Sequence, residues 1–128
     1  MFPDALVCCS EAEAEVYARV TKNLLVHPDS LLGLPLKRQW ILDQLEDEVV
    51  VQVDDDLRHC RCLASRNTSN IIYRPDDILR IVENAMMCAK GAGARMFGFA
   101  NIGDLRYFRP HLPFRLASWV GSVVGIIG

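Results

Sequence analysis

The stretch EVVVQVDDDLRH, Glu48 to His59, decides how the rest of the chain is interpreted. Its valines stand on nearly consecutive positions, a pattern typical of a strand that is buried on both faces. Three aspartates, Asp54, Asp55 and Asp56, follow directly. Adjacent carboxylates repel one another unless water or a cation screens them. Such acids are common in a solvated turn. Hard divalent ions such as Mg²⁺ or Mn²⁺ also bind carboxylate oxygens, and of the two explanations we prefer a metal-binding role.

The segments before this run alternate between two kinds of pattern. Short apolar runs at 4–10 and 22–29 predict strands, and residues 11–20 and the second half of 30–47 predict helices. The alternation predicts an α/β fold with a mostly parallel sheet and helices on both faces. Ser10 and Glu13 have the spacing of a capping box at the first helix. The second helix is expected to turn inward the apolar side chains of Leu36, Trp40, Ile41 and Leu45.

The second half of the chain continues the pattern less regularly. Residues 58–74 predict a hairpin or loop, and residues 75–93 predict a helix that starts at Pro75 and ends at Gly91 or Gly93. Its apolar face is expected from Ile78, Ile81 or Val82, Ala85 and Ala89. Residues 94–101 and the apolar C-terminal tail predict two further strands. We expect one domain over 1–128, incomplete or minimal at its C-terminus.

Composition narrows the class of protein. Of the 128 residues 51% are hydrophobic and 23% are charged, as in ordinary globular proteins, and the formal net charge of -2 argues against general nucleic-acid affinity. The 5 cysteines do not form the pattern of a secreted disulfide framework. We expect them to be small buried side chains in a reducing cytoplasm. Cys60 and Cys62 beside His59 are too closely spaced for a structural zinc pair. Neither a signal peptide nor a membrane span is expected.

In parallel sheets, ligands gather at the carboxyl ends of the strands. The chain places polar residues at three such ends: Ser10 and Glu11, then the segment 27–29, then the aspartates. His27, taken alone, is expected to be structural, and Asp29 to lie near the other polar residues or in a turn.

The order of these elements, with VVVQVDDDL closing the third strand, resembles the nucleotide-sugar glycosyltransferases of the GT-A fold. In that family a strand ends in an acidic D-x-D motif that binds a metal. The resemblance implies that Asp56 is the metal ligand, Asp54 meets the ribose or metal-bound water, and Asp55 is auxiliary. Residues 33–56 also resemble the basic helix that precedes the motif, which brings Lys37 and Arg38 to the nucleotide or its phosphates. Ser10 and Glu11 match positions that contact the base or ribose.

The resemblance implies transfer of a sugar from a nucleoside diphosphate donor to a hydroxyl acceptor, with Mn²⁺ or Mg²⁺ as cofactor. The acceptor is open between protein, lipid, glycan and a modified nucleic-acid base. The catalytic base is unknown; Asp104 and His111 are available, and we expect surface roles for both. The apolar C-terminal strand, if its edge is unpaired, favours a homodimer.

Two alternatives stay open from the residues. Some phosphoryl-transfer enzymes also place D-x-D after a strand, but the haloacid-dehalogenase pattern has Thr or Val where this chain has Arg58. That motif also opens its family, whereas two strand–helix units precede it here. The other alternative is a non-catalytic module that binds nucleotide sugars or another protein chain.

Overall fold

The computed structural model of the chain describes residues 4–65, 68–72, 74–99 and 121–128. These residues form a mixed α/β structure, which confirms that part of the predicted fold class. They divide into two compact units, Met1–Asp47 and Glu48–Gly128. That the units act as one domain stays a prediction, and each is described by itself.

The first unit contains one parallel pair of strands, β1 (Val7–Ser10) and β2 (Leu24–His27), joined by helix α1 (Glu11–Tyr17). The register pairs Ser10 with His27, so both strands end side by side. This confirms the expected strand–helix–strand order. The predicted capping box forms only in part. Ser10 is the N-cap of α1 and its hydroxyl donates to the Glu13 carboxylate at 2.8 Å, but the Ser10 side chain does not accept a hydrogen bond from a backbone amide of the helix.

Helix α2 (Leu34–Gln44) follows Gly33, whose φ of 86° is a backbone conformation that favours glycine. The predicted inner face needs a correction, because Leu36 is 59% exposed. The half-buried side of the helix includes Trp40, Ile41 and Leu45, as predicted, but also the basic residues Lys37 and Arg38. Leu36 lies on the opposite side from Ile41 because the two positions are five residues apart on a helix with 3.6 residues per turn.

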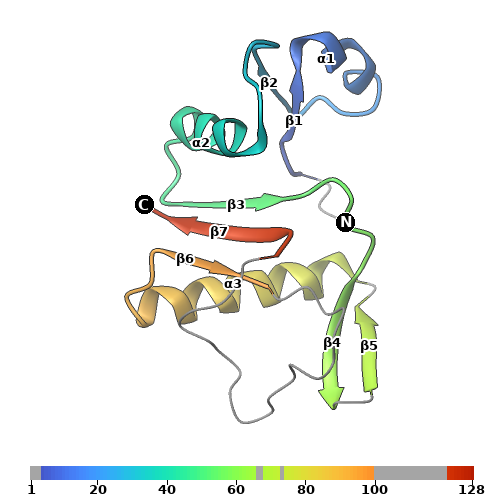
Figure 1. The fold of residues 1–128 in the computed structure, drawn as a ribbon. Coiled ribbons are helices and arrows are strands. Elements are labelled where there is room, and N and C mark those ends of the chain that lie inside the picture. The colour runs from blue at the N-terminus through green and yellow to red at the C-terminus, as the bar shows by residue number, and fades with distance from the viewer. Residues whose placement is uncertain (1–3, 66–67, 73, 100–120) are drawn as a thin grey trace. The chain divides into compact units, whose positions relative to one another are not determined.

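The second unit contains a three-stranded antiparallel sheet in the order β3 (Val49–Val53), β7 (Val123–Ile127) and β6 (Met96–Gly98), shown in Figure 1. A separate antiparallel hairpin joins β4 (Cys60–Ser65) to β5 (Thr68–Ile72), so the hairpin is confirmed. The prediction of a mostly parallel sheet is wrong for the described strands. A run of valines suits parallel and antiparallel neighbours alike, and here β3 pairs with a C-terminal strand that runs the other way.

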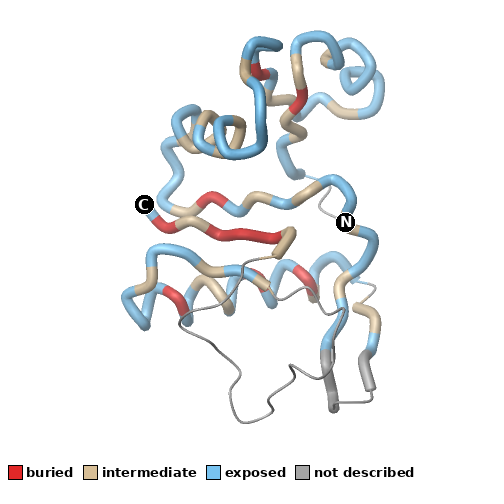
Figure 2. Tube along the Cα trace, in the orientation of Figure 1, coloured by how far each residue is buried: buried red, intermediate tan, exposed pale blue. Residues whose placement is uncertain are grey.

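The core of this unit forms between helix α3 (Pro75–Gly91) and the sheet (Figure 2). Three side chains of α3 are buried, from Ile78, Val82 and Ala89, while Ile81 is exposed. The helix ends in a Schellman motif: Gly93, with φ 70°, donates to the Lys90 carbonyl at 3.0 Å, and Ala94 donates to the Ala89 carbonyl at 2.9 Å. Start, apolar face and glycine stop of this helix therefore follow the sequence.

Strand β7 lies between two partners, with β3 on one edge and β6 on the other. The reason given for a homodimer, an unpaired edge on this strand, is therefore wrong; the dimer itself stays a prediction. Among the described residues no helix is both long and apolar enough to cross a membrane.

The cysteines do not all behave as buried apolar side chains. Cys9 on β1 is buried, but Cys62 and Cys88 are exposed. Cys62 belongs to the two-stranded β4–β5 hairpin, and Cys88 lies on α3 next to the buried Ala89.

Candidate functional site

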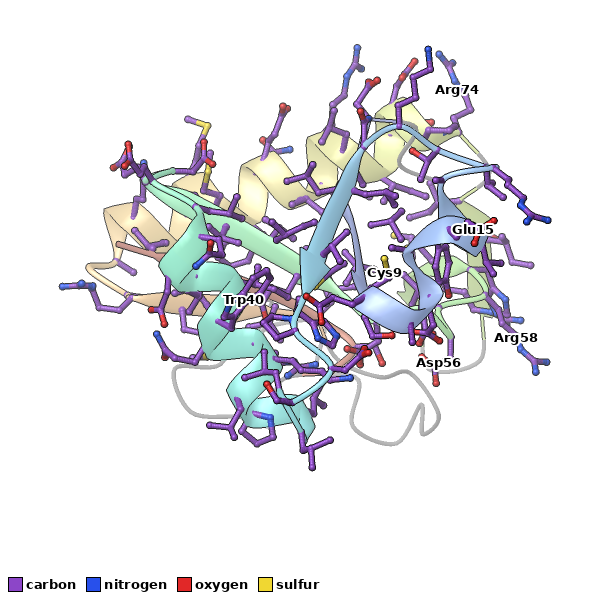
Figure 3. The ribbon with its side chains drawn as sticks, turned by 90° about the horizontal axis from the view of Figure 1, so that it is seen from above. Cys9, Glu15, Trp40, Asp56, Arg58 and Arg74 are labelled. Atoms are coloured by element: carbon purple, nitrogen blue, oxygen red, sulfur yellow. The ribbon has the colours of Figure 1, made fainter. Side chains whose placement is uncertain are left out.

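The acidic turn directly follows β3 in the second unit, where the sequence predicted it. The amide of Asp54 donates to the Ser122 carbonyl at 2.9 Å, which extends the pairing with the β7 segment by one residue. Leu57 then donates to the Asp54 carbonyl at 3.4 Å and closes the turn. Asp54 is half-buried, and Asp55 and Asp56 are exposed. Figure 3 shows Asp56 on this turn and the Arg58 side chain extending outward from it.

The exposure of Asp55 and Asp56 bears on whether their negative charges need a cation. No ion pair links Asp55 or Asp56 to an arginine within the described ranges, so water screens these two carboxylates. Their mutual repulsion therefore does not by itself require a cation. The same exposure leaves their oxygens open to a ligand. In the part of the chain that the structure describes, no group of three or more His, Cys, Asp or Glu side chains converges on a common point. Mg²⁺ is commonly held by one or two carboxylates together with substrate phosphates, so this donor set fits such an ion.

A second polar cluster, the β1–β2 edge, lies in the first unit where the two parallel strands end. It consists of Ser10, Glu11, Glu13, His27 and Asp29. Asp29 and the start of α1 exchange two hydrogen bonds. The Ala12 amide donates to Oδ1 of Asp29 at 3.1 Å, and the Asp29 amide donates to Oε2 of Glu11 at 3.4 Å. The predicted meeting of Ser10 and Glu11 with the segment after β2 is therefore confirmed, and Asp29 fixes the turn.

His27 of this edge is buried and packed, as expected of a structural histidine. It is 4% exposed, and it is a buried polar side chain at the carboxyl end of a strand. Its Nδ1 lies 2.9 Å from the Pro28 carbonyl oxygen, and a carbonyl only accepts, so Nδ1 carries a proton. Trp40 of α2, labelled in Figure 3, meets the imidazole edge-on, with ring centroids 6.1 Å apart. In the sequence, the position of His27 at the end of an apolar run is the feature that indicates its place at the end of a strand.

The basic helix residues lie on α2 in the same unit, and both Lys37 and Arg38 are half-buried. The pKa of the Glu13 carboxyl is lowered, first by the hydrogen bonds from Ser10 and then by electrostatic interaction with Lys37 and, to a smaller extent, with His27. The pKa of the Cys8 thiol is raised by burial and by neighbouring Cys9, while Lys37 acts in the opposite direction. The charge of Lys37 therefore acts on Cys8 of β1 and on Glu13 in the first turn of α1.

Asp104 and His111, the two available bases, lie outside the described residues. No catalytic base is therefore assigned. The geometry gives two polar groupings at strand ends: a carboxylate turn after β3 that is open to a cation, and a hydrogen-bonding edge after β1 and β2.

Comparison with known protein families gives a match over most of the chain. The family model described as TET-associated glycosyltransferase matches residues 3–104, a range that contains the β1–β2 edge, the basic helix and the acidic turn. No curated protein and no solved structure matches the chain.

Proposed function

The chain belongs to the TET-associated glycosyltransferase family, and on that premise we propose that it transfers a sugar from a nucleoside diphosphate donor to a hydroxyl acceptor. The family match carries this proposal, because it covers most of the chain and its name gives the reaction class. The nucleotide-sugar donor, the metal and the GT-A type of fold are finer parts of the proposal. Their support is the order β1–α1–β2–α2–β3, the parallel β1–β2 pair and the acids that follow β3.

The acidic turn is the part of the chain that would hold Mn²⁺ or Mg²⁺. Asp56 would be the principal ligand, with Asp54 and Asp55 beside it. When bound there, the ion neutralises negative charge that develops on the departing diphosphate. The exposure of Asp55 and Asp56 leaves their carboxylates free to coordinate, and the turn closed by Leu57 fixes the backbone that carries them.

The first unit would supply the nucleotide contacts. Lys37 and Arg38 are cations on one helix and suit phosphate oxygens, because a positive charge near the leaving group lowers the energy of the transition state. Ser10 and Glu11 offer a hydroxyl and a carboxylate to the base or ribose. Since Glu11 already accepts a hydrogen bond from Asp29, its orientation is set before a ligand arrives.

A transfer assay tests the proposal. The protein is incubated with Mn²⁺, UDP- or GDP-sugars labelled in the sugar, and a panel of hydroxyl acceptors: a serine- and threonine-containing peptide, an oligosaccharide, a lipid alcohol and an oligonucleotide with a hydroxymethylated base. We expect label on one acceptor and equimolar release of the nucleoside diphosphate. Asp56→Ala should reduce the rate by about 100-fold or more.

Asp76→Ala is the matched control, because Asp76 is also an exposed aspartate of the second unit but lies at the start of α3. It should retain the wild-type rate. If no donor loses its sugar and no nucleoside diphosphate binds, the proposal is wrong. Hydrolysis of a generic aryl phosphate that depends on the same aspartate would instead favour the phosphoryl-transfer alternative.

A further inference from the structure

Helix α2 carries Lys37 and Arg38, so its place beside β1 and β2 decides what these cations reach. Every residue of α2 is described by the structure, and none of them is buried. Helices in proteins gain most of their stability from the face that they bury against the rest of the fold. A helix that buries no side chain completely gains little in this way. Individual contacts of half-buried side chains therefore fix the position of α2.

Trp40 makes such a contact with the end of β2. Its indole ring meets the imidazole of His27 edge-on, with ring centroids 6.1 Å apart and ring planes at 73° to each other. His27 is 4% exposed, and its Nδ1 lies 2.9 Å from the Pro28 carbonyl oxygen, so the imidazole is itself held in place. Aromatic rings in this arrangement attract each other beyond what their buried area provides. The imidazole is therefore a fixed surface against which Trp40 packs.

Lys37 lies one turn before Trp40 on the same side of α2, because three residues correspond to about 300° of rotation. It is half-buried, and its charge acts on two groups outside the helix. Burial raises the pKa of the Cys8 thiol on β1, and Lys37 opposes this rise. The pKa of the Glu13 carboxyl is lowered first by hydrogen bonds and further by Lys37. Since charge interactions weaken with distance, the ammonium group lies toward β1 and the start of α1.

We propose that Trp40 is a positioning residue, which through its contact with His27 holds α2 where Lys37 reaches the diphosphate of the donor. The inference rests on the proposed function, because it takes a nucleoside diphosphate as the ligand. A lysine side chain has a flexible four-carbon stem, and ordering it on binding costs free energy. This cost is smaller when the helix that carries the lysine is already in place. Trp40 acts through Lys37 and does not itself touch the ligand.

Three substitutions test this role. Trp40→Leu keeps an apolar side chain but removes the ring, Trp40→Phe keeps an aromatic ring beside the imidazole, and Lys37→Met removes the charge. Leu42→Ala is the matched control, because Leu42 is also a half-buried apolar side chain of α2 but lies about 200° around the helix from Trp40. Urea unfolding of each variant accompanies the binding measurements, so that affinities are compared at known stability.

The probes are UDP and GDP with Mn²⁺, and the tighter of the two is used throughout. We expect Trp40→Leu and Lys37→Met each to raise its Kd about 10-fold, as for one lost hydrogen bond to a charged group. Trp40→Phe and Leu42→Ala should stay close to wild type. The double variant of Trp40→Leu with Lys37→Met should bind no more weakly than either single variant, because both substitutions remove the same contact. A side chain that only stabilises the fold would instead give additive losses.

An NMR titration of Glu13 tests the position of Lys37 without any nucleotide. Lys37→Met should raise the pKa of Glu13, because it removes a positive charge that lowers this pKa. Trp40→Leu should raise the pKa as well, but should add less when Lys37 is already replaced. A Glu13 pKa that responds to Lys37→Met and not to Trp40→Leu would overturn the inference.

Three binding results would overturn the inference while donor binding stands: additive losses in the double variant, no loss in Lys37→Met, or equal losses in Leu42→Ala and Trp40→Leu. A measurement on wild type does not depend on how the variants fold. Nuclear Overhauser effects between the rings of Trp40 and His27 should persist in the chain saturated with ligand, and their absence would also overturn the inference. If wild type binds neither UDP nor GDP, the proposed function itself is wrong, and the Glu13 titration decides whether Trp40 places Lys37.

Discussion

A methyl group added at Gly125 should destabilise the second unit by about 1–3 kcal/mol, as overpacking does elsewhere. Gly125 lies on the central strand β7, in register with Phe97 of β6. A Cβ at this position would lie 2.1 Å from Cε1 and Cζ of Phe97 and 2.7 Å from Cδ1. Because carbon atoms pack at about 3.5–4.0 Å, the ring would have to retreat by roughly 1.4 Å or more. Its retreat would disturb the edge-on contact with Phe99, whose ring centroid is 6.4 Å away.

Urea unfolding of Gly125→Ala measures this cost. The matched control is Gly91→Ala at the end of α3, where a Cβ meets nothing within 4 Å. That control should be neutral or stabilising by about 0.5–1 kcal/mol, because alanine lowers the entropy of the unfolded chain. Phe97→Leu should rescue part of the loss. The double variant should therefore lose less free energy of unfolding than the two single variants lose in sum. Equal stability of Gly125→Ala and Gly91→Ala, or strict additivity with Phe97→Leu, would show that the ring does not cover the glycine.

Three further predictions follow from the contacts and exposures of individual side chains. In an NMR titration, Ser10→Ala should raise the pKa of Glu13 towards its ordinary value, because the hydrogen bonds from Ser10 are the largest cause of the lowering. In the wild type the lowered pKa stabilises the folded state at pH values above the ordinary carboxyl pKa. This stabilisation is lost as the pH falls through the lowered pKa. An unchanged Glu13 titration would contradict this. Lys90→Met should cost up to about 1 kcal/mol, less at high salt, because the Lys90–Glu48 ion pair at 2.7 Å is partly exposed; a loss that salt does not reduce would mean that packing dominates. In thiol labelling with a disulfide reagent, the exposed Cys62 and Cys88 should react first. Slower reaction is expected of the three thiols that are less exposed or have a raised pKa, which are Cys8, Cys9 and Cys60. The reverse order would contradict these exposures.

Local features of the fold could be predicted because their signals lie within a few residues of one another. Helix α3 has its proline, its apolar positions and its glycine stop in one continuous segment. Ser10 and Glu13 are three residues apart, so their contact depends only on the start of one helix. The strand after α2 is equally local, because five residues suffice to define its apolar run.

Features that depend on distant segments could not be predicted in this way. The valine pattern of β3 indicates an apolar strand but does not identify its neighbour, and the antiparallel partner β7 comes from the far end of the chain. The contact between Phe97 and Gly125 depends on the same pairing. His27 stood out only through its burial and its register with Ser10, neither of which a single histidine in sequence reveals.

Calorimetric titration of UDP and GDP with and without Mn²⁺, on wild type, Asp56→Ala and Asp76→Ala, tests the metal-bridged donor most directly. We predict that Mn²⁺ tightens nucleotide binding to wild type and to the Asp76 variant by about tenfold or more, and that Asp56→Ala removes this gain while the metal-free affinity stays the same. Equal affinity in all these conditions would mean that the acidic turn after β3 does not hold a cation against the diphosphate.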